Sequence, residues 1–103
     1  MVSLKYIYIL KNSVGYFTGS TYSPENVIRT FRKNDDTATF IVVVTLMPKE
    51  SVKAVNFLRY RMTTTDFQYW EKQTKLQMAK WLFKASGTEP LMAKDYSDEL
   101  NKR

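Results

Sequence analysis

Apolar and polar side chains alternate near the start of the chain, in the segment LKYIYIL at residues 4–10. On a strand, this alternation places Tyr6 and Tyr8 on one face and Ile7 and Ile9 on the other. A polar, turn-forming stretch follows at residues 11–13, and residues 14–18 can return as a second strand. The pattern therefore predicts an antiparallel β-hairpin, followed by a polar turn at residues 19–22.

A helix and then a third strand are predicted next. Ser23, Pro24 and Glu25 form a typical helix start, with serine at the N-cap and proline and an acid in the first turn. The helix is expected to end at residues 34–36. Residues 37–47, TATFIVVVTLM, are rich in apolar and β-branched side chains. Such a run is typical of a central strand that is covered on both faces.

The rest of the chain has helical periodicity. One helix starts at Pro48, and its spacing predicts four core-facing residues: Val52, Val55, Leu58 and Met62. A further helix is predicted from residue 65 or 66 to about residue 85, with Gly87 as its stop and a short helix beyond Pro90. Trp70 and Trp81 are expected to be core or interface anchors. The predicted fold is α+β, with a three-stranded antiparallel sheet flanked by helices in the order β-β-α-β-α-α.

The composition fits one domain over residues 1–103. The chain contains neither cysteine nor histidine, which excludes disulfides, thiolate or imidazole metal sites and cysteine nucleophiles. No apolar stretch approaches the ~20 residues that cross a bilayer, and the N-terminus lacks the pattern of a signal peptide. We therefore expect a cytoplasmic protein with no membrane association.

The chain is basic, with 16 Lys and Arg residues against 10 Asp and Glu residues and a formal net charge of +6. A basic domain attracts the phosphate backbone of nucleic acids, and it attracts an acidic protein surface equally well. Nucleic acid and an acidic protein are therefore both expected as partners, and composition does not choose between them.

The segment YIYILKNSVGYFTGST at residues 6–21 resembles the start of the GIY-YIG endonuclease domain. Residues 6–8, Tyr-Ile-Tyr, match the first name-giving triplet, and residues 17–19, Phe-Thr-Gly, match the second. The family continues with a helix bearing an arginine, a third strand, and a helix bearing a metal-binding glutamate. The resemblance covers about residues 4–62 and leaves about residues 66–103 as a C-terminal helical extension.

The resemblance implies that Tyr8 and Arg29 are vestigial catalytic residues, with Arg32 as the alternative arginine. The family's second tyrosine falls on Phe17, which has no hydroxyl, and the family's glutamate falls on Asn56. Glu50 lies six residues before Asn56, on a different helical face. Losing a tyrosine hydroxyl and a metal carboxylate removes parts that phosphodiester hydrolysis needs. We therefore expect no resident metal or other cofactor, and Mg²⁺ or Mn²⁺ only in an active nuclease.

Three functions are consistent with the sequence. The first is a nucleic-acid-binding domain with a degraded nuclease site, of the kind a phage or mobile element would carry as an accessory protein. Its expected binding residues are Tyr6, Tyr16, Arg29, Arg32, Lys33, Lys72 and Lys75. The second is a small basic inhibitor that docks on a host nuclease or defence complex. The third is an active metal-dependent nuclease with a rearranged site that uses Tyr8, Tyr16, Arg29 and Glu50.

Overall fold

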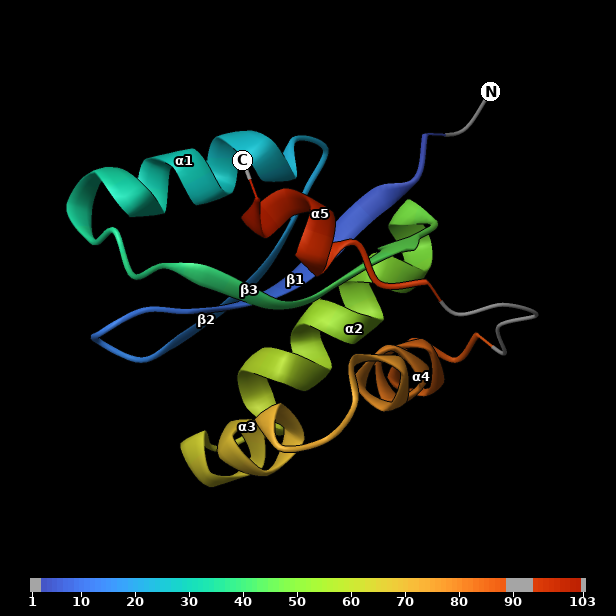
Figure 1. Cartoon of the computed structure of the whole chain (residues 1–103). Coiled ribbons are helices and arrows are strands. Elements are labelled where there is room, and N and C mark those ends of the chain that lie inside the picture. Colours follow the sequence, from blue (N-terminus) through green and yellow to red (C-terminus); the bar gives the residue numbers. More distant parts are fainter. Residues whose placement is uncertain (1–2, 89–93, 103) are drawn as a thin grey trace.

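The predicted hairpin forms in the computed structural model of the chain, which describes residues 3–88 and 94–102 (Figure 1). Its strands are β1 (Lys5–Lys11) and β2 (Tyr16–Thr21). The second strand was predicted over residues 14–18 with a turn at 19–22, and this prediction is wrong. The turn runs on to Gly15, because the Asn12 side-chain oxygen accepts hydrogen bonds from the N–H groups of Val14 and Gly15, and β2 therefore starts two residues later than predicted. Antiparallel pairing with β1 then extends β2 to Thr21, which lies opposite Tyr6.

The third strand, β3 (Thr39–Leu46), pairs antiparallel with the other side of β1, so the sheet order is β2-β1-β3. The prediction that this strand is covered on both faces is confirmed, because every residue from Phe40 to Val44 is buried. The register shifts between Ile9 and Leu10, which pair with Val42 and Phe40. This bulge leaves Ile41 as an extra residue in β3.

Helices cover both faces of the sheet (Figure 1). On one face lie α1 (Pro24–Asn34) and α5 (Ser97–Asn101). On the other lie α2 (Pro48–Tyr60), α3 (Thr64–Glu71) and α4 (Lys75–Ala85). The predicted α+β class with a three-stranded antiparallel sheet is confirmed. Within the described ranges, no helix combines the length and apolar character needed to cross a bilayer.

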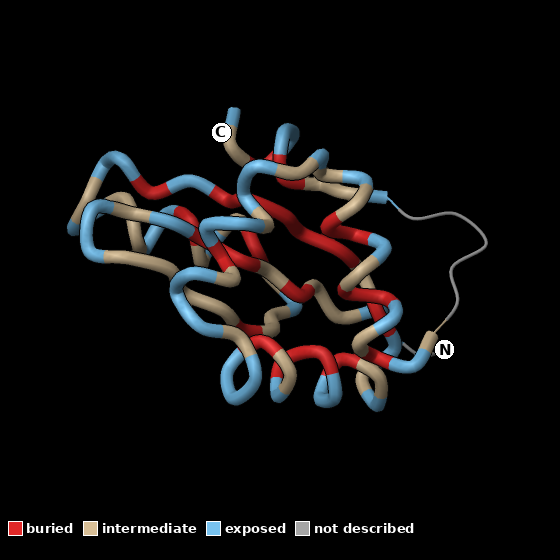
Figure 2. Tube along the Cα trace, turned by 90° about the horizontal axis from the view of Figure 1, so that it is seen from below, coloured by how far each residue is buried: buried red, intermediate tan, exposed pale blue. Residues whose placement is uncertain are grey.

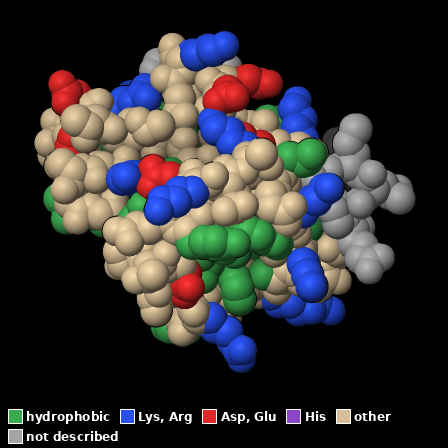
Figure 3. Space-filling model, turned by 60° about the horizontal axis from the view of Figure 1, so that its bottom comes forward, with side chains coloured by type: hydrophobic (Ala, Val, Ile, Leu, Met, Phe, Trp, Pro, Cys, Tyr) green, Lys and Arg blue, Asp and Glu red, His purple; other side chains and the backbone are tan. Residues whose placement is uncertain are grey.

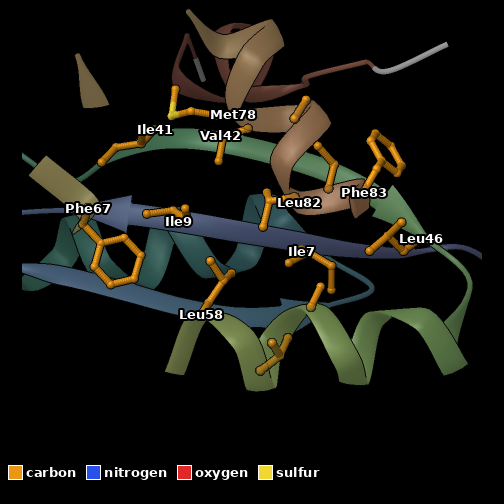
Figure 4. Packing of buried hydrophobic residues seen from close by; sticks show 14 residues of the cluster. Ile7, Ile9, Ile41, Val42, Leu46, Leu58, Phe67, Met78, Leu82 and Phe83 are labelled. Atoms are coloured by element: carbon orange, nitrogen blue, oxygen red, sulfur yellow. The ribbon is translucent and has the colours of Figure 1, made fainter. Parts of the chain in front are cut away.

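The alternation of the first strand divides the core into two clusters. Ile7 and Ile9 pack with β3 and with Leu58 and Leu82 of the helical layer formed by α2, α3 and α4 (Figure 4). Tyr8 faces the opposite side, toward α1 and α5. Buried positions accordingly follow the strands and the inner sides of the helices, while the outer turns are exposed (Figure 2).

The single helix predicted from residue 65 or 66 to residue 85 is two helices, α3 and α4. Thr63 starts α3 through a capping box with Asp66, rather than Thr65 or Asp66 starting it. Thr74 then starts α4, because its side chain accepts a hydrogen bond from the N–H of Gln77. The break brings Trp70 and Trp81 together, with ring centroids 5.0 Å apart. In one continuous helix, residues 70 and 81 would be about 16 Å apart along the axis.

One predicted core position on α2 is also wrong. Val52 is 58% exposed, whereas Val55 and Leu58 are buried as predicted and Met62 packs against the core in part. The helix turns Ser51 toward the protein instead, and the Ser51 hydroxyl is satisfied by the carbonyl of Pro48. A small side chain there lets the start of α2 pack closely.

The C-terminal segment covers the outer edge of β3. The main-chain N–H and C=O of Phe40 bond to the Asn101 side chain, at 2.8 Å and 2.9 Å. The N–H of Val43 donates to Asp95, and its carbonyl accepts from the N–H of Tyr96. These hydrogen bonds satisfy backbone groups of β3 that would otherwise be unpaired at the edge of the sheet. The short helix predicted near the C-terminus is α5, while Pro90, after which it was predicted, lies outside the described residues.

Candidate functional site

Tyr8 lies on the sheet face that α1 covers. Its ring packs edge-on against Phe40, with centroids 5.6 Å apart, and passes over Gly19 on the neighbouring strand. Burial raises the pKa of the Tyr8 hydroxyl, and the Arg59 guanidinium opposes that rise in part. Tyr8 therefore keeps its proton at neutral pH, which is the wrong state for a general base. Sequence reasoning gave Arg59 no role, because nothing local links α2 to β1.

Phe17 occupies the position where the resembled family has its second tyrosine. Its ring packs against Phe31 of α1, with centroids 5.1 Å apart and planes tilted by 53°. The position is therefore part of the contact between the hairpin and α1. No hydroxyl is available there to assist a reaction at Tyr8.

The predicted arginines on α1 have different environments. Arg29 is exposed, and its Nη1 donates to the Asn26 side chain at 3.1 Å. Arg29 and exposed Lys33 line a hollow with Ile28 and Arg32, while Tyr8 lines a different hollow beside Asn26. Arg32 serves the fold, because its guanidinium donates to the carbonyls of Ala38 and Asn101, each at 3.0 Å.

The remaining predicted tyrosines take part in packing. Tyr6 packs edge-on against Tyr96, with centroids 5.7 Å apart. Tyr16 stacks on Phe67 on the opposite sheet face, because neighbouring side chains of a strand alternate between its faces. The Tyr16 hydroxyl donates to Glu71 at 2.5 Å. Burial and this hydrogen bond raise the pKa of Tyr16, so its proton stays in the contact between β2 and α3.

Lys75 and Lys72, two of the predicted binding lysines, differ in whether their charge is paired with a carboxylate. Lys75 donates to Ser97 and pairs with Asp98, so it ties α4 to α5. Lys72 is exposed at the end of α3 and forms no ion pair with a described carboxylate. Of the two, Lys72 is the one whose charge is available to a partner.

The four residues of a rearranged nuclease site are not brought together. Tyr8 and Arg29 belong to the α1 side of the sheet, whereas Tyr16 belongs to the side of α2 and α3, and Glu50 lies on α2. Asn56, which stands at the position of the family's glutamate, is also on α2. Among the residues that the structure describes, no three acidic side chains are grouped in a way that could hold a metal ion.

The structure shows a surface that sequence reasoning missed. Three aromatic rings from three helices form a continuous row, with Trp70 between Phe57 and Trp81 at centroid distances of 6.3 Å and 5.0 Å. Two adjoining hollows of about 350 Å³ and 570 Å³ share Phe57 and Ala85 in their lining. We call this surface the aromatic groove, and define it by Phe57, Trp70, Trp81, Lys53, Arg61 and Lys84.

The aromatic groove is positively charged. Lys53, Arg61 and Lys84 line it, and no acidic residue among those that the structure describes does. None of the three forms an ion pair with a carboxylate in the described part of the chain. On the side of the helical layer, hydrophobic side chains gather in one patch with Lys and Arg on several sides and an acidic side chain near one end (Figure 3).

Comparison with known proteins gives no match to this chain, whether against protein-family models, curated proteins or solved structures.

Proposed function

We propose that this protein is a nucleic-acid-binding domain that does not cut nucleic acid. The observation that carries the proposal is the number of basic side chains that form no ion pair with a carboxylate of the described residues. In the described residues, ion pairs involve Lys11, Lys75 and Lys94. The cations that form no ion pair with a described carboxylate include Lys5, Arg29, Lys33, Lys49, Lys53, Arg59, Arg61, Lys72, Lys80, Lys84 and Lys102. Free cations of this kind attract a phosphate backbone.

The absence of cutting is proposed from the geometry around Tyr8. Phe17, at the position where the resembled family has its second tyrosine, packs on α1, and Glu50 lies on a helix across the sheet. The raised pKa keeps Tyr8 protonated. A cytoplasmic location and an origin in a phage or mobile element belong to the same proposal.

Two measurements test this function. Affinity for mixed-sequence DNA should fall log-linearly with salt concentration, with a slope set by the number of phosphates contacted. Plasmid incubated with the protein and Mg²⁺ or Mn²⁺ should stay supercoiled. Metal-dependent nicking that Arg29→Ala abolishes would instead identify an active nuclease.

A second candidate function is docking on an acidic protein, as an inhibitor of a nuclease or defence complex would do. The favouring observation is the exposure of two apolar side chains on α2, Val52 at 58% and Tyr60 at 79%. Exposed apolar patches rimmed by polar residues often mark protein interaction sites. Capture of one stoichiometric acidic partner, together with salt-insensitive and negligible DNA binding, would favour this function.

A further inference from the structure

The aromatic groove is built by contacts between helices that are separate in sequence. Phe57 comes from α2, Trp70 from α3 and Trp81 from α4, and Tyr69 extends the row by stacking on Trp81 with planes 19° apart. Phe57, Trp70 and Trp81 are each partly exposed, and Tyr69 is 58% exposed. Aromatic side chains normally hide most of their surface, so a row that stays open to solvent is a candidate contact surface.

The cations stand at defined places beside the rings. Lys84 is three residues after Trp81 on α4, and Arg61 follows α2 just beyond Phe57. Lys53 lies one turn before Phe57, with its Nζ close to the end of α4 at Gly87. A chain crossing the groove would therefore meet positive charge alongside the aromatic row.

We propose that the aromatic groove binds single-stranded nucleic acid, with bases stacked on the rings and phosphates held by Lys53, Arg61 and Lys84. The proposal rests on the nucleic-acid-binding function above and names its substrate class and its surface. Proteins that bind single strands combine aromatic stacking with a positively charged groove, because every base offers a flat face to an aromatic ring.

The groove favours a single strand over the other polyanions. In a duplex, the flat faces of the bases are already stacked on each other, so partly exposed rings on the protein would have no base to contact. A protein partner fits less well, because protein interfaces are depleted in lysine and two of the three cations here are lysines.

The test compares a fluorescein-labelled single-stranded DNA of about 12 nucleotides with the duplex of the same sequence. The single strand should bind more tightly and quench tryptophan fluorescence. Trp81→Ala should weaken this binding by about 5–150-fold, the loss expected for one stacked base. Trp81→Phe should restore most of the affinity, since a phenyl ring still stacks. Tyr22→Ala is the matched control, because Tyr22 is an exposed aromatic outside the groove.

Variants that keep the core intact test the charges separately. Lys53→Gln and Lys84→Gln should each make the slope of log affinity against log salt less steep by about 0.7, the value for one phosphate contact on a single strand. Lys94→Gln is the matched control, since Lys94 pairs with Glu99 away from the groove. Circular dichroism of each variant checks that the fold is retained.

The outcomes separate the groove from the general function. The proposed role of the groove would be overturned if Trp81→Ala, Lys53→Gln and Lys84→Gln all leave tight DNA binding unchanged, or if the duplex is clearly preferred. Either result would leave the nucleic-acid-binding function in place. Failure to bind either form of DNA or the matching RNA strand would overturn both. Capture of one acidic protein through Trp81 without binding of any single strand would assign the groove to a protein partner.

Discussion

The hydroxyl of Tyr8 lies directly over Gly19 of the neighbouring strand. A Cβ atom at residue 19 would be 2.7 Å from the Tyr8 oxygen and 3.0 Å from the ring carbon that bears it. Glycine is therefore favoured here, because any larger side chain would force the Tyr8 ring or the strand to shift. This contact with Tyr8 explains why residue 19, the last residue of the triplet at residues 17–19, is glycine. The explanation needs no catalytic role for the triplet.

Gly19→Ala should destabilise the protein by about 1–3 kcal/mol, because the tyrosine ring or the strand must move to make room. Urea unfolding measures the change. Tyr8→Phe in the same chain should recover part of the loss, since it removes the atom nearest to the new methyl group. Ser20→Ala is the control and should change stability by less than about 0.5 kcal/mol. An equal loss with and without the Tyr8 hydroxyl would show that the contact is not the cause.

Asn101→Ala should open the outer edge of β3. The substitution leaves the N–H and C=O of Phe40 without their side-chain partners and should cost about 1–3 kcal/mol. Hydrogen exchange should show faster exchange of the Phe40 amide. The exposed neighbour Lys102, changed to alanine, serves as the control. Unchanged protection of Phe40 would mean that the edge is covered by something other than this amide.

Much of the fold could be predicted because its signals are local. Alternation assigned the two faces of β1, Pro24 and Pro48 marked the starts of α1 and α2, and the apolar run fixed β3 within two residues at its start. These features depend on steric and solvation preferences of neighbouring residues, which the sequence displays directly.

The aromatic groove could not be predicted because it depends on where a helix breaks. The apolar residues between 65 and 85 recur at helical spacing without interruption. The break at Thr74 is marked only by the capping hydrogen bond that its side chain accepts from the N–H of Gln77. Once the cap breaks the helix, Trp70 and Trp81 meet and Phe57 joins them from a third helix. The influence of Arg59 on Tyr8 was missed for a related reason: it joins residues 51 positions apart, which only the tertiary fold brings together.

Thr74→Ala should weaken the start of α4. The variant loses the hydrogen bond from the Gln77 N–H, and an N-cap change of this kind costs about 1 kcal/mol. Thermal unfolding measures the loss, and Thr74→Ser should retain stability because serine caps as well. If the break between α3 and α4 also positions Trp70 against Trp81, Thr74→Ala should alter tryptophan fluorescence in the folded protein. A change in stability without a change in fluorescence would show that tertiary packing alone holds Trp70 against Trp81.

Asp35 joins the hairpin turn to the loop between α1 and β3, and this contact should depend on pH. Its carboxylate accepts from the N–H and hydroxyl of Ser13 and from the N–H and hydroxyl of Thr37. The hydrogen bonds from Ser13, followed by those from Thr37, hold the pKa of Asp35 well below its usual range. A pKa that is lower in the folded state gives stability that is present above the unfolded value, about 3.9, and is lost as pH falls toward the folded value.

Asp35→Asn should therefore be less stable than the natural protein at neutral pH, and the difference should shrink steadily below about pH 4. Urea unfolding of both proteins between neutral pH and pH 2 measures this difference. Asp36→Asn is the control, because the Asp36 side chain forms no hydrogen bond within the described residues. A difference that stays constant down to pH 2 would mean that Asp35 stabilises the turn through its shape and not through its charge. A shrinking difference would show that the ionised carboxylate holds the hairpin turn against the loop after α1.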